Sequence, residues 1–383
     1  MTTNNYNLAL VGFGNVGKAF VRLLRAKREI LRERHGIEFR VTGVSSRRLG
    51  WRAAPGGFDL DALCEGEFRG DAQRKEGSST LTDAGASDSS RDRDLPTPSG
   101  SGRDDTAGVA HDIGRETEFS SEDVRLWLKA ARADVLFEAT SLNRHTGEPA
   151  AEHMRAALEH GAHAISANKG PVVFHYDELM TLAKANGKRF LFESSVMDGM
   201  PIFNMFRHCL PAIELRGFRG VLNSTTNVIL SEMERGLSFE DALRKAQEIG
   251  VAESDPTDDI DGWDAAVKTV ALANVLMGAR LRPGDVAREG IAQLTGEQVR
   301  VARCHGKAYK LVCRASLHDG NVLASVRPEQ VPLSDPLALV DGTSSIIYFE
   351  TDMFPGLALT EDHAGLDATA YGLLADLITA VRS

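Results

Sequence analysis

A glycine-rich turn between an apolar run and a long amphipathic segment is the feature that most limits the fold of this chain. Residues 8–11 are typical of a buried strand, and residues 18–34 are typical of a helix. Between them, Gly12 permits a tight bend, Gly14 lets the backbone approach a pyrophosphate, and Gly17 allows close packing of helix on strand. This order predicts a dinucleotide-binding α/β fold, with a purely structural turn as the alternative. The predicted cofactor contacts here are Gly12, Gly14, Asn15, Val16 and Gly17.

The end of the next predicted strand indicates which dinucleotide is bound. NAD-selective versions of this fold end that strand with an acid that holds the ribose 2′-hydroxyl. Here the strand over residues 39–44 is followed by two serines and then by Arg47 and Arg48. Guanidinium groups suit a 2′-phosphate better than a free hydroxyl. We therefore predict NADP(H) in preference to NAD(H), with an arginine loop that only faces solvent as the alternative.

Alternating strands and helices continue further along the chain, as expected for a doubly wound sheet of the Rossmann type. Strands are predicted over residues 133–139, 163–167 and 189–193, with helices between them. In such sheets, ligands bind beyond the carboxyl ends of the strands. Judged by position alone, Lys169 is as compatible with the surface as with this edge. The polar residues predicted at the cofactor edge are Thr140, Ser141, Ser166 and Lys169.

The last third of the chain predicts a second sheet. Strand-like alternation over residues 307–317, 321–326, 344–350 and 356–359 is typical of a sheet with one covered face. A final helix is predicted over residues 366–381. We expect this helix to return to the nucleotide-binding half.

A chain of 383 residues is long enough for two domains. We predict a dinucleotide-binding domain of residues 1–199, completed by residues 360–383, and a substrate-binding domain of residues 200–359. The stretch 78–110 has few large apolar residues and cannot bury enough surface to offset the entropy of ordering. We therefore expect a disordered insertion there, in a surface loop.

Composition excludes several classes of partner. The formal net charge is −10 and no basic tract is present, which argues against nucleic acid and anionic membranes. The first residues do not resemble a signal peptide, and no apolar run reaches membrane-spanning length. The four cysteines lie far apart, without the close cysteine and histidine pairs of a zinc site. We expect a cytoplasmic protein that acts on a small molecule.

A dense group of acids before one lysine marks the predicted reaction centre. Six carboxylates lie within residues 250–264, and Lys268 follows in an otherwise small and apolar stretch. Asp264 and Lys268 are four residues apart, so they share one face of a buried helix. Such a pair either transfers protons or is a structural ion pair in a helix capped by Asp258 or Asp261. The residues alone leave both interpretations open.

Four motifs together resemble the homoserine dehydrogenase family over most of the chain outside the insertion. The last two are not general features of dinucleotide-binding folds. The resemblance implies reversible hydride transfer between NADP(H) and the pair L-homoserine and L-aspartate 4-semialdehyde, in threonine and methionine biosynthesis. It also implies a homodimer formed through the second domain. The motifs are Gly12-x-Gly14-x-Val16-Gly17, Asn168-Lys169, Asn223-Ser224-Thr225-Thr226-Asn227 and Glu253-x-Asp255-Pro256-x-Asp258-Asp259-x-x-Gly262-x-Asp264-x-x-x-Lys268.

The resemblance also implies roles for individual residues. Lys268 would exchange a proton with the substrate oxygen, Asp264 would orient the substrate or that lysine, and Lys169 would lie beside the nicotinamide. Alcohol oxidation needs a group that takes the hydroxyl proton, and one lysine beside an acid meets that need without a metal. The implied substrate contacts are Glu253 and Asp259 for the amino group and the backbone of Ser224 and Thr225, and further cofactor contacts are Gly250 and Gly365.

Family members can also bind a monovalent cation such as sodium. The resemblance implies that backbone carbonyls of one loop would hold it here. This chain departs from the family in that loop, which is less glycine-rich than usual, and at Ser224, where the family usually has glycine. It departs again at residues 361–365, where a glycine-rich cofactor loop is usual and only Gly365 matches it clearly. The implied cation ligands are Glu193, Val196, Asp198 and Met200.

Two alternatives to this function remain. One is a dehydrogenase of the same architecture that acts on another small amino or hydroxy acid. The other is a catalytically silent protein that senses dinucleotides and binds a partner through residues 78–110. Longer relatives carry a regulatory or kinase domain, and we expect no threonine-binding regulatory site in this chain, which ends at Ser383.

Overall fold

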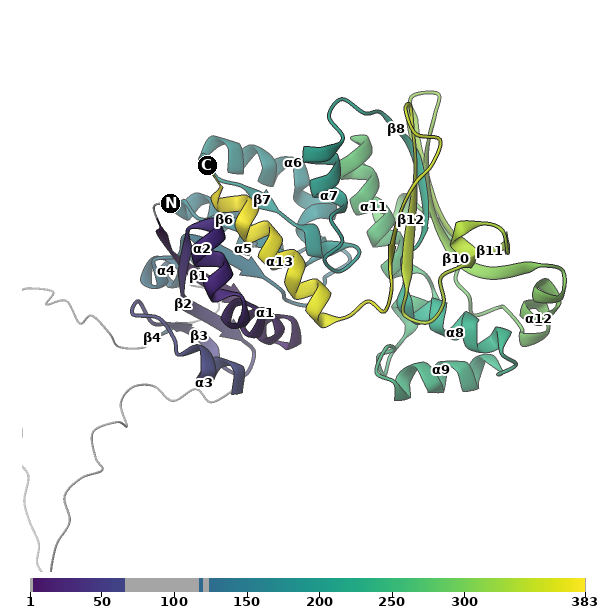
Figure 1. Ribbon diagram of the computed structural model, residues 1–383, viewed down its shortest axis with the longest axis horizontal. Helices are drawn as coiled ribbons and strands as arrows, with labels where there is room; N and C mark the ends of the chain where they lie inside the picture. Colours follow the sequence, from purple (N-terminus) through teal and green to yellow (C-terminus); the bar gives the residue numbers. More distant parts are fainter. Residues whose placement is uncertain (1–2, 66–116, 120–123, 383) are drawn as a thin grey trace, which may run out of the picture.

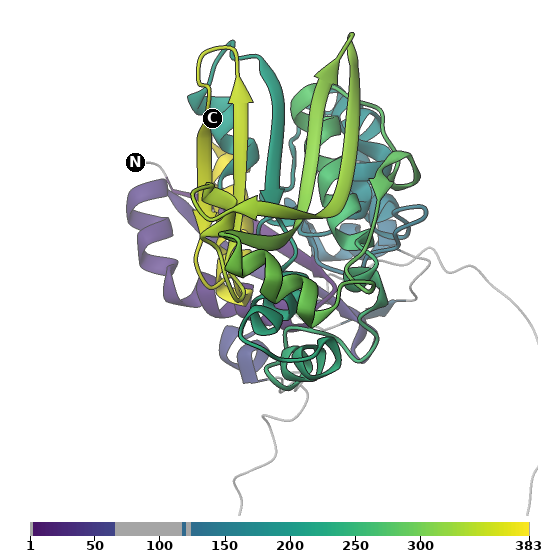
Figure 2. The ribbon, with the colours of Figure 1, turned by 90° about the vertical axis from the view of Figure 1, so that its right-hand side faces the viewer.

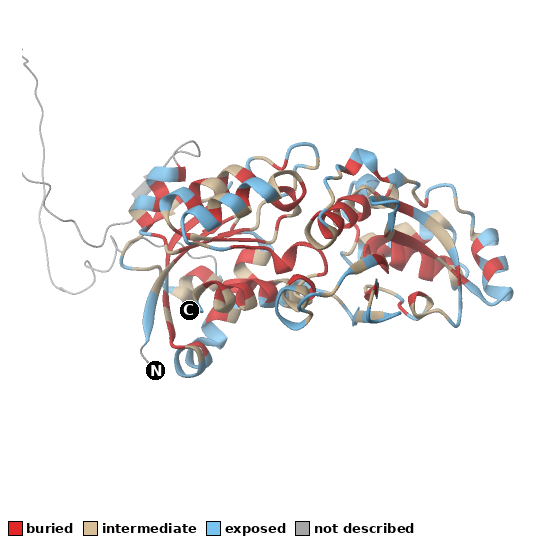
Figure 3. Cartoon of the chain, turned by 90° about the horizontal axis from the view of Figure 1, so that it is seen from above, coloured by how far each residue is buried: buried red, intermediate tan, exposed pale blue. Residues whose placement is uncertain are grey.

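The computed structural model describes residues 3–65, 117–119 and 124–382, which form two sheets flanked by helices (Figure 1). The predicted insertion, residues 78–110, lies outside the described residues. Buried positions concentrate on the strands and on the helices between the sheets, and exposed positions form the outer surface (Figure 3). Within the described residues, no helix is both long and apolar enough to cross a membrane.

The first sheet confirms the predicted doubly wound architecture. It has seven strands in the order β4-β3-β2-β1-β5-β6-β7, and its parallel part runs from β2 to β7. Two short antiparallel strands, β3 and β4, extend one edge and had no counterpart in the sequence prediction. The bounds are β1 Asn4–Val11, β2 Ile37–Ser46, β3 Gly50–Ala53, β4 Thr117–Phe119, β5 Val135–Glu138, β6 His163–Ser166 and β7 Phe190–Leu191.

One helix prediction in this half was wrong in its bounds. The single helix predicted over 18–34 is two helices, because Lys27 leaves helical geometry with φ −101° and ψ 6°. Helix α6 begins at Lys169, where the Asn168 side chain caps it by accepting the Gly170 N–H at 2.8 Å, and it is kinked at His175, where φ is −134° and ψ is 18°. The bounds are α1 Asn15–Ala26, α2 Arg28–His35, α3 Leu60–Glu65, α4 Val124–Ala131, α5 Ala150–His160 and α6 Lys169–Ala185.

The chain passes to the second half through short, irregular elements. After Pro201 the chain forms a three-residue helix followed by a π-helical turn. The elements are the 3-10 turn Glu193–Ser195, α7 Ile202–Asn204 and the π-helical turn Met205–Cys209.

The second sheet confirms the predicted strands of the last third. Its six strands have the order β13-β12-β8-β10-β11-β9, and it stands in front of the first half in Figure 2. The long hairpin of β10 and β11 keeps one register along its whole length. The strand bounds are β8 Leu215–Val221, β9 Ala287–Arg288, β10 Lys307–His318, β11 Asn321–Pro332, β12 Ser345–Thr351 and β13 Leu357–Glu361.

Helix α11 joins the two halves. It lies between the second sheet and α6 (Figure 1), and one apolar cluster runs from the first sheet through both helices to the second sheet. The helices of the second half are α8 Ser224–Glu234, α9 Phe239–Glu248, α10 Thr257–Ile260, α11 Trp263–Met277 and α12 Gly296–Cys304.

The last helix, α13 Leu366–Val381, returns to the first half as predicted. It packs beside α1, where Leu373 and Leu377 join the apolar cluster that contains Phe20 (Figure 1). The two crossings between the halves meet where Gly199 contacts α13. A Cβ atom added to Gly199 would lie 2.1 Å from the Ala368 carbonyl oxygen, so this approach requires glycine. The predicted domain limits follow the same division but stay a prediction.

Candidate active site

Three charged side chains from two helices meet beside the junction of the halves. The Lys268 Nζ donates to Asp264 Oδ2 at 3.0 Å and to the Leu222 carbonyl at 2.6 Å. From the start of α6, the Lys169 Nζ lies 3.3 Å from Asp264 Oδ1. The remaining side chains of α11 are largely apolar and buried. Asp264 therefore lies between two ammonium groups that the fold, rather than the local sequence, brings together.

Asn223 links this cluster to the predicted substrate acid. Its Nδ2 donates to Asp259 at 2.7 Å and to Asp264 at 3.0 Å, and its Oδ1 accepts the Thr226 N–H at 2.9 Å. The last bond caps α8, so the motif residues after Asn223 form the first turn of that helix. Sequence reasoning assigned no role to Asn223 itself. The pattern that could have identified it is an asparagine directly before a helix, where the side chain can cap the first turn.

The capping interpretation of the acidic segment is wrong. Gly262 occupies the position before α11, with φ 78° and no side-chain cap, and Pro256 precedes α10. Asp258 instead contacts Arg144. Asp259 and Asp264 therefore do not cap a helix, and their carboxylates are available to the site.

Burial and charge set the protonation of the central pair. Burial alone would raise the pKa of Asp264, but the ammonium groups of Lys268 and Lys169 outweigh it and hold that pKa well below its usual value. Burial alone would lower the pKa of Lys268, but Asp264 outweighs it and raises that pKa. At neutral pH the site therefore presents a carboxylate and a protonated lysine.

A cavity of about 200 Å³ connects this pair with the glycine-rich turn. A dehydrogenase needs such a connection, because the proton-transfer group and the nicotinamide must reach the same carbon and oxygen of the substrate. Its lining includes Val16, Thr140, Lys169, Asp198, Lys268 and Thr369. Lys268 thus lines the same cavity as Val16 of the dinucleotide motif.

The glycine-rich turn fits a bound pyrophosphate. Gly12 has φ +84°, and a Cβ added there would lie 2.4 Å from the Ala139 carbonyl carbon, so only glycine fits. Beside Gly14 the nearest other atom is 4.0 Å from an added Cβ. Helix α1 begins at Asn15 with no side-chain cap and no acid in its first turn. Its first N–H groups therefore remain available to an anion.

The other residues of the cofactor edge form a buried polar network. Glu138, which sequence reasoning missed, is fully buried and accepts the Thr140 N–H at 2.9 Å. Ser166 bonds to Glu138 at 3.3 Å, and Asn168 Nδ2 donates to the carbonyls of Thr140 at 3.1 Å and Ser141 at 3.3 Å. This network orders the ends of β5 and β6. The sequence pattern that could have identified Glu138 is an acidic residue at the end of an apolar strand.

Several predicted residues lie outside the cluster. Glu253 is exposed, and Gly250, with φ +75°, follows the end of α9. Arg47 and Arg48 are exposed directly after β2. Gly365 precedes α13. Ser224 and Thr225, in the first turn of α8, bond to the carbonyls of Thr343 and Val251, both at 3.2 Å.

The predicted cation loop lies at the crossing between the halves. The Glu193 carboxylate is buried and accepts N–H groups of Phe203 at 2.7 Å and Asn204 at 2.8 Å. Burial first, and then the charge of Asp376, raise the pKa of Glu193 to about 8. Asp198 accepts the Thr369 hydroxyl at 2.7 Å. Among the described residues, His, Cys, Asp and Glu side chains form no group of three that could hold a metal.

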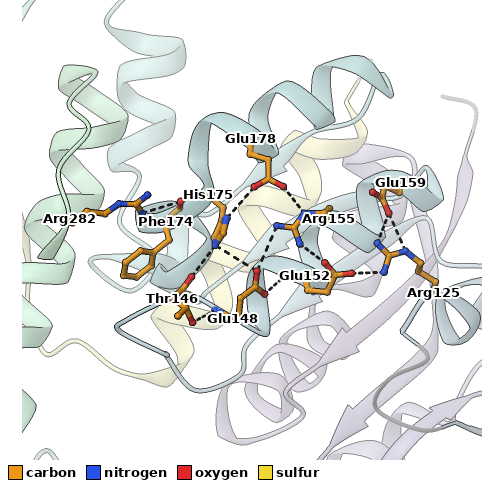
Figure 4. A network of polar contacts seen from close by, with 10 residues as sticks. All are labelled: Arg125, Thr146, Glu148, Glu152, Arg155, Glu159, Phe174, His175, Glu178 and Arg282. Carbon is orange, nitrogen blue, oxygen red and sulfur yellow. Dashed lines mark hydrogen bonds and ion pairs between the residues drawn. The ribbon is translucent and has the colours of Figure 1, made fainter.

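A larger hollow of about 540 Å³ lies beside α6 and the start of α11 but includes neither reactive lysine. Arg282 borders it, donating to the Phe174 carbonyl at 3.1 Å, and His175 continues into a chain of ion pairs across α5 (Figure 4). Of these two cavities, the smaller one joins a lysine ion-paired with an acid to the glycine-rich turn, so it is the candidate reaction site.

The chain is similar to known proteins of one family. The family described as homoserine dehydrogenase matches residues 201–378, and its NAD binding domain matches residues 103–193. An NAD(+)-dependent homoserine dehydrogenase of Pseudomonas canavaninivorans is 33% identical, over 97% of this chain and 95% of that protein. A homoserine dehydrogenase of Methanocaldococcus jannaschii is 34% identical, over 97% of each chain. A hyperthermophilic archaeal homoserine dehydrogenase mutant solved with NADPH is 27% identical, with a TM-score of 0.73 and 98% of each chain covered.

Proposed function

Because this chain belongs to the homoserine dehydrogenase family, whose members are NAD(P)-dependent oxidoreductases acting on CH–OH groups, we propose that it interconverts L-aspartate 4-semialdehyde and L-homoserine. One observation carries the proposal. A single cavity is lined by Val16 of the glycine-rich turn and by both lysines that contact Asp264. Hydride transfer and proton transfer at one substrate carbon and oxygen require this juxtaposition.

We assign the proton transfer to Lys268. When the aldehyde is reduced, the protonated Lys268 gives a proton to the carbonyl oxygen; when the alcohol is oxidised, neutral Lys268 takes it back. Asp264 holds the Nζ in place through its 3.0 Å bond. The raised pKa of Lys268, for which Asp264 overcomes the effect of burial, favours the donor form and so favours reduction near neutral pH.

Lys169 and the acid beside Asn223 hold the ends of the substrate in this proposal. Lys169 is 20% exposed toward the cavity and provides a cation for the substrate oxygen or carboxylate. Asp259 receives the substrate ammonium, and Asn223 fixes Asp259 at 2.7 Å. Glu253, which is exposed in the described structure, reaches the ammonium only if its segment closes over the substrate.

The cofactor site is proposed to hold NADP(H), whose nicotinamide supplies or accepts the hydride when bound. The N–H groups at the start of α1 receive the pyrophosphate, with Gly12 and Gly14 giving the close approach. In this proposal Arg47 and Arg48 contact the 2′-phosphate, and their exposure directly after β2 supports it. Known relatives differ here: one is named NAD(+)-dependent and another was solved with NADPH.

Three further properties of the protein belong to this proposal. We infer a homodimer, a cytoplasmic location, and a sodium ion held by carbonyls of Glu193, Val196, Asp198 and Met200. Analytical ultracentrifugation checks the first of these, and activation by sodium over a matched choline salt checks the last.

The decisive test is turnover of L-aspartate 4-semialdehyde, followed by loss of NADPH absorbance. We expect activity in the wild-type protein and a fall in kcat of roughly 10²–10⁴-fold in Lys268→Met. Lys245→Met is a matched control, because Lys245 also pairs with an acid, Glu232 at 2.7 Å, but lies outside the cavity. Absence of wild-type turnover contradicts the substrate, and full activity of Lys268→Met contradicts the proton donor.

A further inference from the structure

Glu361 is a buried acid that the proposed chemistry does not yet use, and its carboxylate feels the charges of Asp198 and Lys268, which line the cavity. It ends β13 opposite Ser345 of β12, and residues 362–365 then cross to α13 (Figure 1).

Glu361 is strongly buried and incompletely satisfied. The residue is 8% exposed, and its Oε2 has no hydrogen-bond partner among the described residues. A buried carboxylate without a partner is unfavourable, so such groups either bind a proton or receive a ligand. The opposing position of β12, Ser345, is not charged.

The nearby charges indicate which ligand chemistry fits. The charges of Asp198 and Lys268, which both line the cavity, shift the pKa of Glu361. Lys268 is already paired with Asp264. Asp259 acts on Lys268 as well. The site thus gathers more acids than the two lysines neutralise. Burial first, and then the charge of Asp198, raise the pKa of Glu361 to about 7, and Lys268 acts against this rise.

We propose that the Glu361 carboxylate binds an organic cation that the reactants bring into the site. Two cations are available in the proposed reaction, the oxidised nicotinamide ring and the substrate ammonium, so this inference depends on the proposed function. A cation beside Glu361 favours its ionised form. Binding therefore releases a proton wherever Glu361 is still partly protonated before binding.

Proton release on binding tests this directly in the wild-type protein. Isothermal titration calorimetry in two buffers of different ionisation enthalpy measures the protons exchanged. At pH 7 we expect roughly half a proton to be released, because the group is about half protonated there, and release should fade by pH 9. Affinity for the cation should rise with pH through about 7 and then level off.

Glu361→Gln, which keeps the size of the side chain, should abolish this release and flatten the pH dependence. Asp376→Asn is a matched control: Asp376 is buried, with a pKa that burial raises to about 7, but its bonds go to Glu193 and Asn204 rather than into the cavity. Release should persist in that variant. The wild-type measurement stands even if a variant does not fold.

Separate titrations distinguish the two cations. Release with NADP⁺ but not with NADPH identifies the nicotinamide ring as the partner. Release only when homoserine joins a preformed complex with reduced cofactor identifies the ammonium. No release in either arm, or equal release in Glu361→Gln, overturns the proposal. Dinucleotide binding does not require turnover, so lack of activity with the aldehyde would contradict the proposed function without deciding the nicotinamide arm.

Discussion

Two acids in this protein occupy the same formal position, each between two cations, yet their surroundings differ. Asp264 lies between Lys169 and Lys268 in the reaction site, and Glu152 lies between Arg125 and Arg155 on the outer face of α5 (Figure 4). In both acids, burial would raise the pKa but the two cations outweigh it, so each pKa is lowered. Proximity of charge alone therefore does not distinguish a reaction site from a surface network.

The presence of a second ion-pair partner for each cation does distinguish the surface network from the reaction site. Arg125 has a second acid in Glu159 at 2.7 Å, and Arg155 has a second acid in Glu178 at 2.6 Å. Lys169 and Lys268 share Asp264 as the one carboxylate within 4 Å that the described residues provide. A network in which each cation has a second acid keeps its structure when one acid is removed. A site with a single shared partner is sensitive to its loss, and the same lack of spare partners leaves it ready to receive a ligand.

The largest expected effect comes from Asp264→Asn. It leaves two ammonium groups in a largely buried site without their carboxylate, and we expect a loss of about 3 kcal/mol in the free energy of unfolding. Urea denaturation measures this loss. An unchanged midpoint would show that solvent screens the two lysines as well as it screens the surface arginines.

The pH dependence sharpens the same prediction. Because the folded pKa of Asp264 lies below its ordinary value of 3.8, the stabilisation is fully present above that value and is lost as pH falls through the folded pKa. The difference between wild-type protein and Asp264→Asn should therefore be constant near neutrality and shrink in strong acid.

An intermediate effect is expected where an exposed arginine meets a ligand. Arg47→Ala should weaken NADP⁺ binding about tenfold, or about 1.4 kcal/mol, and leave NAD⁺ binding nearly unchanged. Fluorescence titration with both nucleotides measures this. Equal losses for the two would refute a contact with the 2′-phosphate and restore the interpretation of a solvent-facing loop.

The smallest effect is expected from Glu152→Gln. Each arginine keeps another acid, so the free energy of unfolding should fall by less than about 1 kcal/mol, and moderate salt should shrink the loss further. Thermal denaturation at two ionic strengths measures it. A loss as large as that of Asp264→Asn would break the contrast drawn between the two acids.

Much of the fold could be predicted because it depends on local patterns. The glycine-rich turn, the alternating strands of the second sheet and the final helix each have a signal within a few residues, and all three are confirmed. The helix bound that failed involves a single residue, because Lys27 interrupts the segment 18–34 that apolar periodicity marks as one helix.

The site could be predicted only in part, for a physical reason. Asp264 and Lys268 share a helical face, which sequence spacing reveals, but their contacts with Lys169 and Asn223 join residues far apart in the chain. Only the resemblance to a family brought these segments together in advance. The resemblance did not indicate a role for Glu361, because its importance arises from burial and from neighbours on other elements.

The close approach of Gly199 to α13 has a mechanical consequence. A Cβ atom added at Gly199 would lie 2.1 Å from the Ala368 carbonyl oxygen and 2.8 Å from the Gly372 nitrogen, so any larger residue would push this segment and α13 apart. Asp198 and Thr369, which line the cavity and bond to each other at 2.7 Å, lie on these two segments. The shape of the cavity wall therefore depends on the absence of a side chain at position 199.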